Sequence, residues 1–215
     1  MLQVCWSPKG GVGTSVVAAA SALLAAAAGQ QTLLVDLDGD QEAILGVEVG
    51  EGVGDWFAAP DDVGPDSLRA LEVDVVDRLR ILGRGRASRA DWRPSRVDVA
   101  VALFSARAEL VVVDAGRGLN VDPPPGATEA VVTRGCYLSL RRLVESLPRE
   151  ARVVLIEEPG RALGRSDVAA ALGRVDVGLQ WDPAVARAVD AGLLTSRMPR
   201  SLRPISGLLR SGVIR

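Results

Sequence analysis

A glycine-rich stretch near the N-terminus constrains the fold more than any other part of the sequence. Residues 7–15 read Ser-Pro-Lys-Gly-Gly-Val-Gly-Thr-Ser, between a strand predicted over residues 2–6 and an alanine-rich helix predicted over residues 15–28. Glycines in this context let backbone N–H groups converge on phosphate oxygens, and the helix N-terminus adds the positive end of its dipole. The hydroxyl of Ser15 is then placed to coordinate Mg²⁺. The structural alternative is an ordinary glycine-rich turn.

Short apolar runs recur along the chain, and helical patterns follow most of them. Further strands are predicted over residues 32–36, 78–82, 110–114, 130–133, 152–156 and 175–179. Further helices are predicted over residues 95–106, 139–146, 166–172 and 183–191. Runs of β-branched residues that alternate with helices are typical of an α/β fold, with a mostly parallel sheet and helices on both faces. Residues 46–77 are rich in Gly, Pro and Asp and receive no element.

Composition excludes several kinds of chemistry. The chain has 215 residues and no histidine, so a Ser-His-Asp triad, a Cys-His dyad and a histidine-rich metal site are ruled out. Its two cysteines, Cys5 and Cys136, are too few for a disulfide scaffold or a Cys-only zinc site. Lys9 is the one lysine among 25 basic residues, and the net charge is −2. Without a signal peptide or an apolar run of membrane-spanning length, we expect a cytoplasmic protein.

Three aspartates follow predicted strands. Asp36 and Asp38, at positions i and i+2, should face the same side of the sheet and suggest an acid/base pair. Asp114 follows four apolar residues, so its carboxylate should emerge at the C-terminal edge of the sheet, where ligand sites of α/β proteins lie. The structural alternatives are two solvated loop carboxylates and a turn-forming aspartate.

The string Lys-Gly-Gly-Val-Gly-x-Ser, with its lysine ahead of the glycines, resembles the deviant Walker A motif of the ParA/MinD family of P-loop ATPases. Residues 32–40 (TLLVDLDGD) resemble the second motif of that family, and residues 109–118 (ELVVVDAGRG) resemble its Walker B and switch II. Residues 127–143 resemble the strand and helix that follow, and residues 181–192 resemble the late loop and helix on the nucleotide side. The resemblance implies a ParA/MinD-like P-loop fold that binds ATP and Mg²⁺.

The resemblance also implies roles for single residues. Lys9 would reach across a dimer to the phosphates of the partner subunit, and Asp38 would position the attacking water, which makes both catalytic. Gly116 would lie near the γ-phosphate, and Pro183 in the loop on the adenine side. The implied nucleotide-binding set is Lys9, Gly10, Gly11, Val12, Gly13, Thr14, Ser15, Gly116 and Pro183. The implied metal set is Ser15, Asp36 and Asp114.

Two departures from the family pattern bear on activity. Thr14 occupies the position of a second lysine that usually contacts the β- and γ-phosphates, and a hydroxyl has neither the charge nor the reach for that contact. The usual adenine-contacting Asn is missing after the strand that ends near Ile156, where the sequence reads Glu-Glu-Pro. Adenine contacts would then come from the backbone or from residues 181–183. We therefore expect slow or absent ATP hydrolysis.

Loss of the second lysine also makes the sequence similar to one branch of the family, the CpaE/TadZ-like proteins of Tad pilus assembly and related septum-site-type proteins of actinobacteria. That resemblance implies spatial positioning or assembly through an ATP-dependent homodimer. Implied partners are proteins of a pilus, secretion or division machinery, with polar or peripheral membrane localisation. Two alternatives are a nucleotide-free protein-binding scaffold and a DNA-binding partition ATPase, although a near-neutral charge disfavours strong DNA binding.

Two arginine-rich regions lie outside these motifs. Between residues 78 and 96 there are seven arginines, which could touch nucleotide, DNA or a partner or form a solvated face. We divide the chain into a P-loop domain over residues 1–195 and a basic C-terminal helix or tail over residues 196–215. Leu202, Ile205, Leu208 and Leu209 have near-helical spacing in that tail, which favours packing on the domain over a membrane-binding helix because Pro204 and Gly207 weaken the helix.

Overall fold

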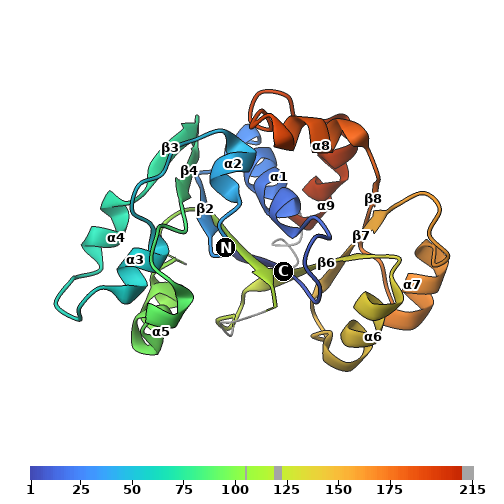
Figure 1. Ribbon diagram of the computed structural model, residues 1–215, viewed down its shortest axis with the longest axis horizontal. Helices are drawn as coiled ribbons and strands as arrows, with labels where there is room; N and C mark the ends of the chain where they lie inside the picture. Colours follow the sequence, from blue (N-terminus) through green and yellow to red (C-terminus); the bar gives the residue numbers. More distant parts are fainter. Residues whose placement is uncertain (105, 119–122, 210–215) are drawn as a thin grey trace.

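The computed structural model describes residues 1–104, 106–118 and 123–209, and these form one α/β domain around an eight-stranded sheet (Figure 1). The strand order is β3-β4-β2-β5-β1-β6-β7-β8. The strands are β1 (Leu2–Ser7), β2 (Thr32–Asp36), β3 (Val73–Val76), β4 (Leu79–Leu82), β5 (Leu110–Arg117), β6 (Thr128–Arg134), β7 (Arg152–Glu157) and β8 (Val177–Gln180). All neighbouring pairs are parallel except β3 with β4, which confirms the predicted mostly parallel sheet.

Helices cover both faces of the sheet, as predicted. Figure 1 shows α1, α2, α8 and α9 on one face and α3 to α6 on the other. The helices are α1 (Thr14–Ala27), α2 (Gln41–Leu45), α3 (Val53–Ala58), α4 (Asp66–Ala70), α5 (Pro94–Phe104), α6 (Tyr137–Ser146), α7 (Arg165–Leu172), α8 (Pro183–Asp190) and α9 (Ser206–Leu209). Two 3₁₀ helices, η1 (Arg89–Asp91) and η2 (Arg200–Ile205), complete the described elements. Because seven of the strands are parallel, the loops that follow them gather at one edge of the sheet.

Helix α1 packs closely on the centre of the sheet because its buried side chains are small. Ala18, Ala19, Ala22 and Ala25 are each 0% exposed, and α1 makes contacts with β1, β2, β4, β5 and β6. The helix ends where Gly29 adopts a left-handed conformation with φ of 95°, as its place in the sequence predicts. This packing fixes the N-terminal end of α1 directly beneath the glycine-rich stretch.

Residues 46–77 contain more structure than the sequence indicates. Helices α3 and α4 lie there, and β3 pairs antiparallel with β4 to form the edge of the sheet. The helices have only six and five residues, which is too short for a helical repeat of apolar residues to stand out. Strand β3 alternates half-buried and exposed residues, as expected of an edge strand.

The described part of the C-terminal segment packs on the domain. Leu202, Ile205 and Leu208 are buried in the core cluster that contains α1, and η2 and α9 both contact that helix. Pro204 lies inside η2, which explains why this stretch is 3₁₀ rather than α-helical. Residues 210–215 lie outside the described residues, and they include Arg210 and Arg215, the last two basic residues of the predicted tail.

The packing of α1 makes a direct prediction about stability. Replacing Ala22 with Leu should lower the free energy of unfolding by about 1–3 kcal/mol, because the added atoms have no space beneath the sheet. Ala27→Leu is the matched control, since Ala27 lies on the same helix but is exposed. Urea unfolding followed by circular dichroism measures both. An equal effect of the two substitutions would contradict close packing at Ala22.

Candidate functional site

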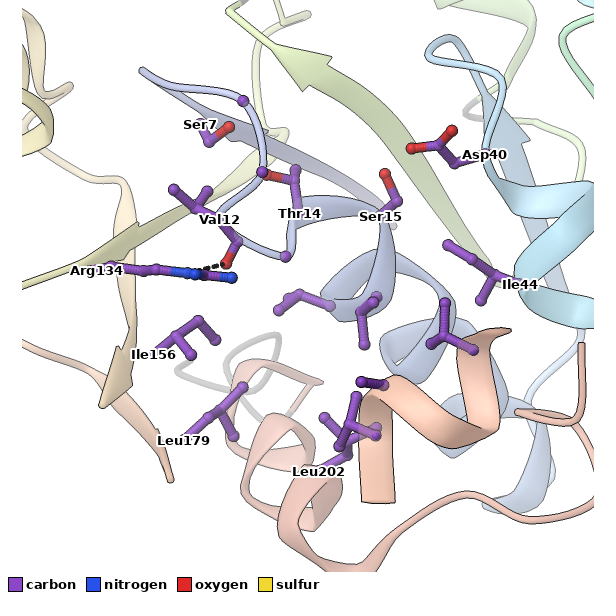
Figure 2. Close-up of a pocket in the computed structure, with 18 of the residues that line it drawn as sticks. Ser7, Val12, Thr14, Ser15, Asp40, Ile44, Arg134, Ile156, Leu179 and Leu202 are labelled. Carbon is purple, nitrogen blue, oxygen red and sulfur yellow. Dashed lines mark hydrogen bonds between the residues drawn. The ribbon is translucent and has the colours of Figure 1, made fainter. Parts of the chain in front are cut away.

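A pocket of about 700 Å³ opens at the edge of the sheet where the parallel strands end (Figure 2). Its polar side is formed by the glycine loop, the first turn of α1, the loop after β2 and the end of β5. Its apolar side is formed by side chains of α1, α2, β8, α8 and η2, among them Ile44, Leu179 and Leu202. The volume lies within the range of small-molecule sites, and the two-sided lining suits a ligand with one anionic and one apolar end.

Eight of the predicted site residues line this pocket: Gly10, Gly11, Val12, Gly13, Thr14, Ser15, Asp38 and Gly116. The loop depends on left-handed backbone at Gly11 and Gly13, with φ of 73° and 102°. Gly13 precedes α1 and offers no side-chain cap, so the first amides of the helix stay available to a ligand. The hydroxyl of Ser7 donates to the backbone oxygens of Lys9 and Gly116, at 3.0 and 3.3 Å, which ties the glycine loop to the end of β5.

Four predicted site residues do not line the pocket. Lys9 is exposed. Pro183 is the first residue of α8, but the pocket is lined by its neighbours Trp181 and Asp182. The other two, Asp36 and Asp114, are both 0% exposed and lie beneath the loops.

Asp36 holds the loop after β2 in shape. Its Oδ1 accepts hydrogen bonds from the amides of Asp38 and Gly39, and its Oδ2 accepts one from the amide of Gln41. Burial raises the pKa of this carboxyl, and the three amide bonds oppose that shift. Strand β2 ends at Asp36, so the alternation of a strand does not extend to Asp38. The two side chains therefore take different positions, and the expected acid/base pair on one face is wrong.

Asp114 lies beside Asp36, as its register partner on the neighbouring strand β5. Its Oδ2 accepts from Gln41 Nε2 at 2.7 Å, and its Oδ1 accepts from the amide of Gly116 at 3.1 Å. The pKa of Asp114 is raised from 3.8 to about 7, mainly because the carboxyl is buried. The negative charge of Asp36 adds to the rise, while hydrogen bonds with Gln41 and Ser15 oppose it. Asp114 thus joins Gln41, Ser15 and Gly116 in one buried polar cluster.

Gln41 was not predicted from the sequence, because it lies in a short helix and belongs to no motif. Its Nε2 also donates to the backbone oxygen of Ser15 at 2.9 Å, while its Oε1 is buried without a hydrogen-bond partner among the described residues. A buried oxygen with no donor fits a bound cation or a water close to Ser15. Together with the hydroxyl of Ser15, this cluster suits Mg²⁺ held mainly by a nucleotide, which needs only one or two protein ligands.

Asp38 projects into the pocket against the backbone of Gly116. A Cβ at position 116 would come within 2.2 Å of the Asp38 carboxyl carbon, and Gly116 has φ of 61°, so only glycine fits there. A guanidinium nitrogen of Arg89 lies 3.4 Å from Asp38 Oδ1. Asp38 is therefore oriented from two sides and stays about one-third exposed.

Arg134 is a second functional candidate that motif analysis missed. It ends β6, lines the pocket and donates from Nε to the backbone oxygen of Val12 at 3.4 Å (Figure 2). One guanidinium nitrogen lies 3.6 Å from Glu158, and the guanidinium lies 5.3 Å from the ring of Trp181. Its position in the sequence was the available signal, since a charged residue directly follows a predicted strand at the edge where the other loops gather.

Most of the arginine run between residues 78 and 96 is engaged within the domain. Arg96 is 6% exposed, donates to three backbone oxygens of residues 56–63, and lies 3.8 Å from the ring centroid of Trp56. Ion pairs join Arg78 to Asp77, Arg80 to Glu72, Arg89 to Asp38 and Arg93 to Asp61. Most arginines of this run thus make contacts within the domain, so few of their charges are left to attract a polyanion such as DNA.

Within the described ranges, no three His, Cys, Asp or Glu side chains form a group able to hold a metal by themselves. Cys5 and Cys136 are free thiols. The same ranges contain no helix with the length and apolar character needed to cross a membrane.

The sheet order, the glycine loop and the alanine-rich helix beneath it define the fold of the MinD/ParA P-loop ATPases. The septum site-determining protein MinD of Pyrococcus horikoshii, in complex with Mg-ADP, aligns with a TM-score of 0.78 and 16% identity, over 97% of this chain and 94% of that one. A ParA family ATPase of Chlorobium tepidum aligns with a TM-score of 0.73 and 18% identity, over 95% of each chain. The MinC:MinD cell division protein complex of Aquifex aeolicus aligns with a TM-score of 0.73 and 18% identity, over 100% of this chain and 98% of that one.

Sequence comparison gives one further relative. An uncharacterized protein of Streptomyces coelicolor is 31% identical over 191 residues, which cover 83% of this chain and 48% of that protein. The chain thus spans about half the length of the curated relative that it matches. No protein-family model matches the sequence.

The contact between Gly116 and Asp38 predicts an unequal effect of two glycine substitutions. Gly116→Ala should lower the free energy of unfolding by more than Gly118→Ala, because both glycines have positive φ but, among the described residues, only the Cβ at 116 meets another side chain. We expect about 1 kcal/mol for Gly118→Ala and a clearly larger loss for Gly116→Ala. Urea unfolding measures both values. Equal losses would mean that Asp38 does not rest on Gly116.

The raised pKa of Asp114 predicts a pH dependence of stability. The folded protein keeps a proton on Asp114 up to about pH 7, whereas the unfolded chain releases it near 3.8. The contribution of this group to the free energy of unfolding is therefore full below 3.8 and decreases as the pH rises to about 7. In metal-free buffer, Asp114→Asn should show a shallower decrease between pH 5 and pH 7 than the unmodified protein. Identical slopes would contradict a buried, protonated Asp114.

Proposed function

We propose that the chain binds ATP with Mg²⁺ and uses the bound nucleotide to control a spatial positioning or assembly process, with slow or absent hydrolysis. The observation that carries this proposal is the pocket itself. It combines a glycine loop, the uncapped N-terminus of α1 and an apolar compartment in one cavity. Mg-ADP is present in the Pyrococcus horikoshii MinD structure with the same fold.

Different residues of the pocket would bind different parts of the nucleotide. The amides of residues 10–15 would take the phosphates, and the apolar side chains of α1, α8 and η2 would cover the base. Ser15 would hold Mg²⁺, with Asp114 and Gln41 behind it, while Asp36 would support the site by shaping the loop after β2. When bound, Mg²⁺ would offset the charge of the phosphate oxygens. Gly116 would lie close to the terminal phosphate, with Asp38 placed to orient a water.

Slow or absent hydrolysis follows from the charges available at the phosphates. Thr14 lines the pocket where P-loop ATPases of the Walker type carry a lysine that reaches the β- and γ-phosphates. A missing cation of this kind raises the barrier to phosphoryl transfer, while the backbone contacts that bind the nucleotide remain. Pro183 and its neighbours Trp181 and Asp182 would contribute to the adenine side, as the missing asparagine requires.

We further propose that two copies of the chain associate when ATP is bound. Lys9 is exposed and does not line the pocket of its own chain, which supports a contact with the phosphates held by a second copy. By its resemblance to CpaE/TadZ-like and septum-site-type proteins, the dimer would act in the cytoplasm, at a pole or at the inner membrane face. Its partner would be a protein of a pilus, secretion or division machinery; MinD of Aquifex aeolicus is found in complex with MinC.

A nucleotide-free scaffold is the second candidate, and one observation favours it. The pocket is lined by four aspartates, Asp38, Asp40, Asp182 and Asp190, against two arginines, which is an unfavourable balance for a polyanion without Mg²⁺. A DNA-binding partition ATPase is the third candidate, and the internal ion pairs of the arginine run disfavour it. A scaffold would associate with its partners whether or not nucleotide is present.

Size-exclusion chromatography with light scattering separates these candidates. We expect the unmodified protein to change from monomer to dimer when ATP and Mg²⁺ are added, and Lys9→Ala to remain a monomer because it lacks the cation that crosses between subunits. Arg165→Ala is a suitable control, because Arg165 is an exposed arginine that does not line the pocket. An unchanged mass with ATP would argue against a nucleotide-controlled dimer. A nucleotide-independent dimer that Lys9→Ala leaves intact would favour the scaffold.

A further inference from the structure

Arg134 is the basic side chain most closely associated with the glycine loop inside the pocket. Of the two arginines that line the cavity, Arg117 is exposed, whereas the Arg134 side chain is only 19% exposed. Its Nε donates to the backbone oxygen of Val12, within the loop and two residues before Thr14 (Figure 2). The guanidinium therefore stands beside the segment whose amides would take the phosphates.

The contacts of Arg134 leave much of its hydrogen-bonding capacity unused. A guanidinium has five N–H donors in a planar fork. Among the described residues, Arg134 makes one hydrogen bond, at 3.4 Å, and one ion pair, at 3.6 Å from Glu158. Both distances are at the long end of their ranges. Glu158 has a closer partner in Arg161, at 2.6 Å, so it does not hold Arg134 tightly.

Arginine is well suited to an anionic ligand at this place. Its planar fork can make two parallel hydrogen bonds to phosphate oxygens, and these charge-assisted bonds are stronger than neutral ones. The pocket has a particular need for such a group, since Thr14 brings no charge and the lining has an excess of aspartates. Arg134 meets this need better than Arg117, the other arginine of the lining, because it is partly buried and bonded to the loop, whereas Arg117 is exposed.

We infer that Arg134 supplies, from the end of β6, the cationic phosphate contact that Thr14 cannot make. On binding, the guanidinium exchanges its long contacts to Val12 and Glu158 for phosphate oxygens of the nucleotide. The positive charge that contacts the phosphates then comes from the end of β6 and not from the glycine loop itself. This inference rests on the proposed nucleotide-binding function and assigns a specific role to a residue outside every motif of the sequence.

Isothermal titration calorimetry tests the inference with two probes, ATP with Mg²⁺ and inorganic tripolyphosphate with Mg²⁺. Arg134→Gln should weaken the binding of both probes by about tenfold or more, because both carry the phosphates. Arg134→Lys keeps the charge but loses the fork, so it should weaken binding less. Arg165→Gln removes one charge from an exposed arginine outside the pocket lining and should leave both affinities within twofold. Melting temperatures of all variants verify that the fold is intact.

A double substitution tests whether Arg134 stands in for a lysine at position 14. Thr14→Lys introduced into Arg134→Gln should recover most of the lost ATP affinity. Three results would overturn the inference: Arg134→Gln binding ATP within twofold of the unmodified protein, a loss for ATP with none for tripolyphosphate, or no recovery in the double variant. An unmodified protein that binds neither probe at millimolar concentration would instead refute the proposed nucleotide-binding function, and this inference with it.

Discussion

A buried network of polar side chains beneath the loops is the interaction on which the rest of the site depends. Asp36 accepts three backbone amides of the loop after β2, and Asp114 accepts from Gln41 and from the amide of Gly116. Gln41 continues the network to the backbone of Ser15. In this way β2, β5, α1 and α2 are joined at one point, and the loops that line the pocket are held by fully buried groups. Removing one member would leave its partners unsatisfied in the interior, where the cost is high.

This network also explains why the carboxylates of Asp36 and Asp114 support the site from beneath the loops and do not line the pocket. Asp36 is fully buried, does not line the pocket and accepts three backbone amides, so it shapes the loop rather than facing the pocket. Asp114 lies closer to Ser15, and its pKa of about 7 leaves it balanced between protonated and ionised forms near neutrality. A cation bound close to it would favour the ionised form. Mg²⁺ binding and the charge of Asp114 should therefore be coupled.

The central fold could be predicted from the sequence because its strands are buried on both faces and read as continuous apolar runs. β1, β2 and β7 end within one residue of their predicted limits. The edge strand β3 and the helices α3 and α4 could not be predicted, since four to six residues give too little of a repeat. The glycine loop, Asp38 and Gly116 were found through their motif, whereas Gln41 and Arg134 are brought to the pocket only by the tertiary fold.

We propose that the glycine loop binds phosphates through its backbone and takes its positive charge from Arg134, on a different strand. The central claim is that the pocket binds a nucleoside triphosphate, and calorimetric titration of the unmodified protein with ATP in the presence of Mg²⁺ tests it most directly. The account predicts saturable binding of one nucleotide per chain, weakened when Mg²⁺ is removed by a chelator. Absence of binding at millimolar ATP would contradict it and leave the fold as a protein-binding scaffold.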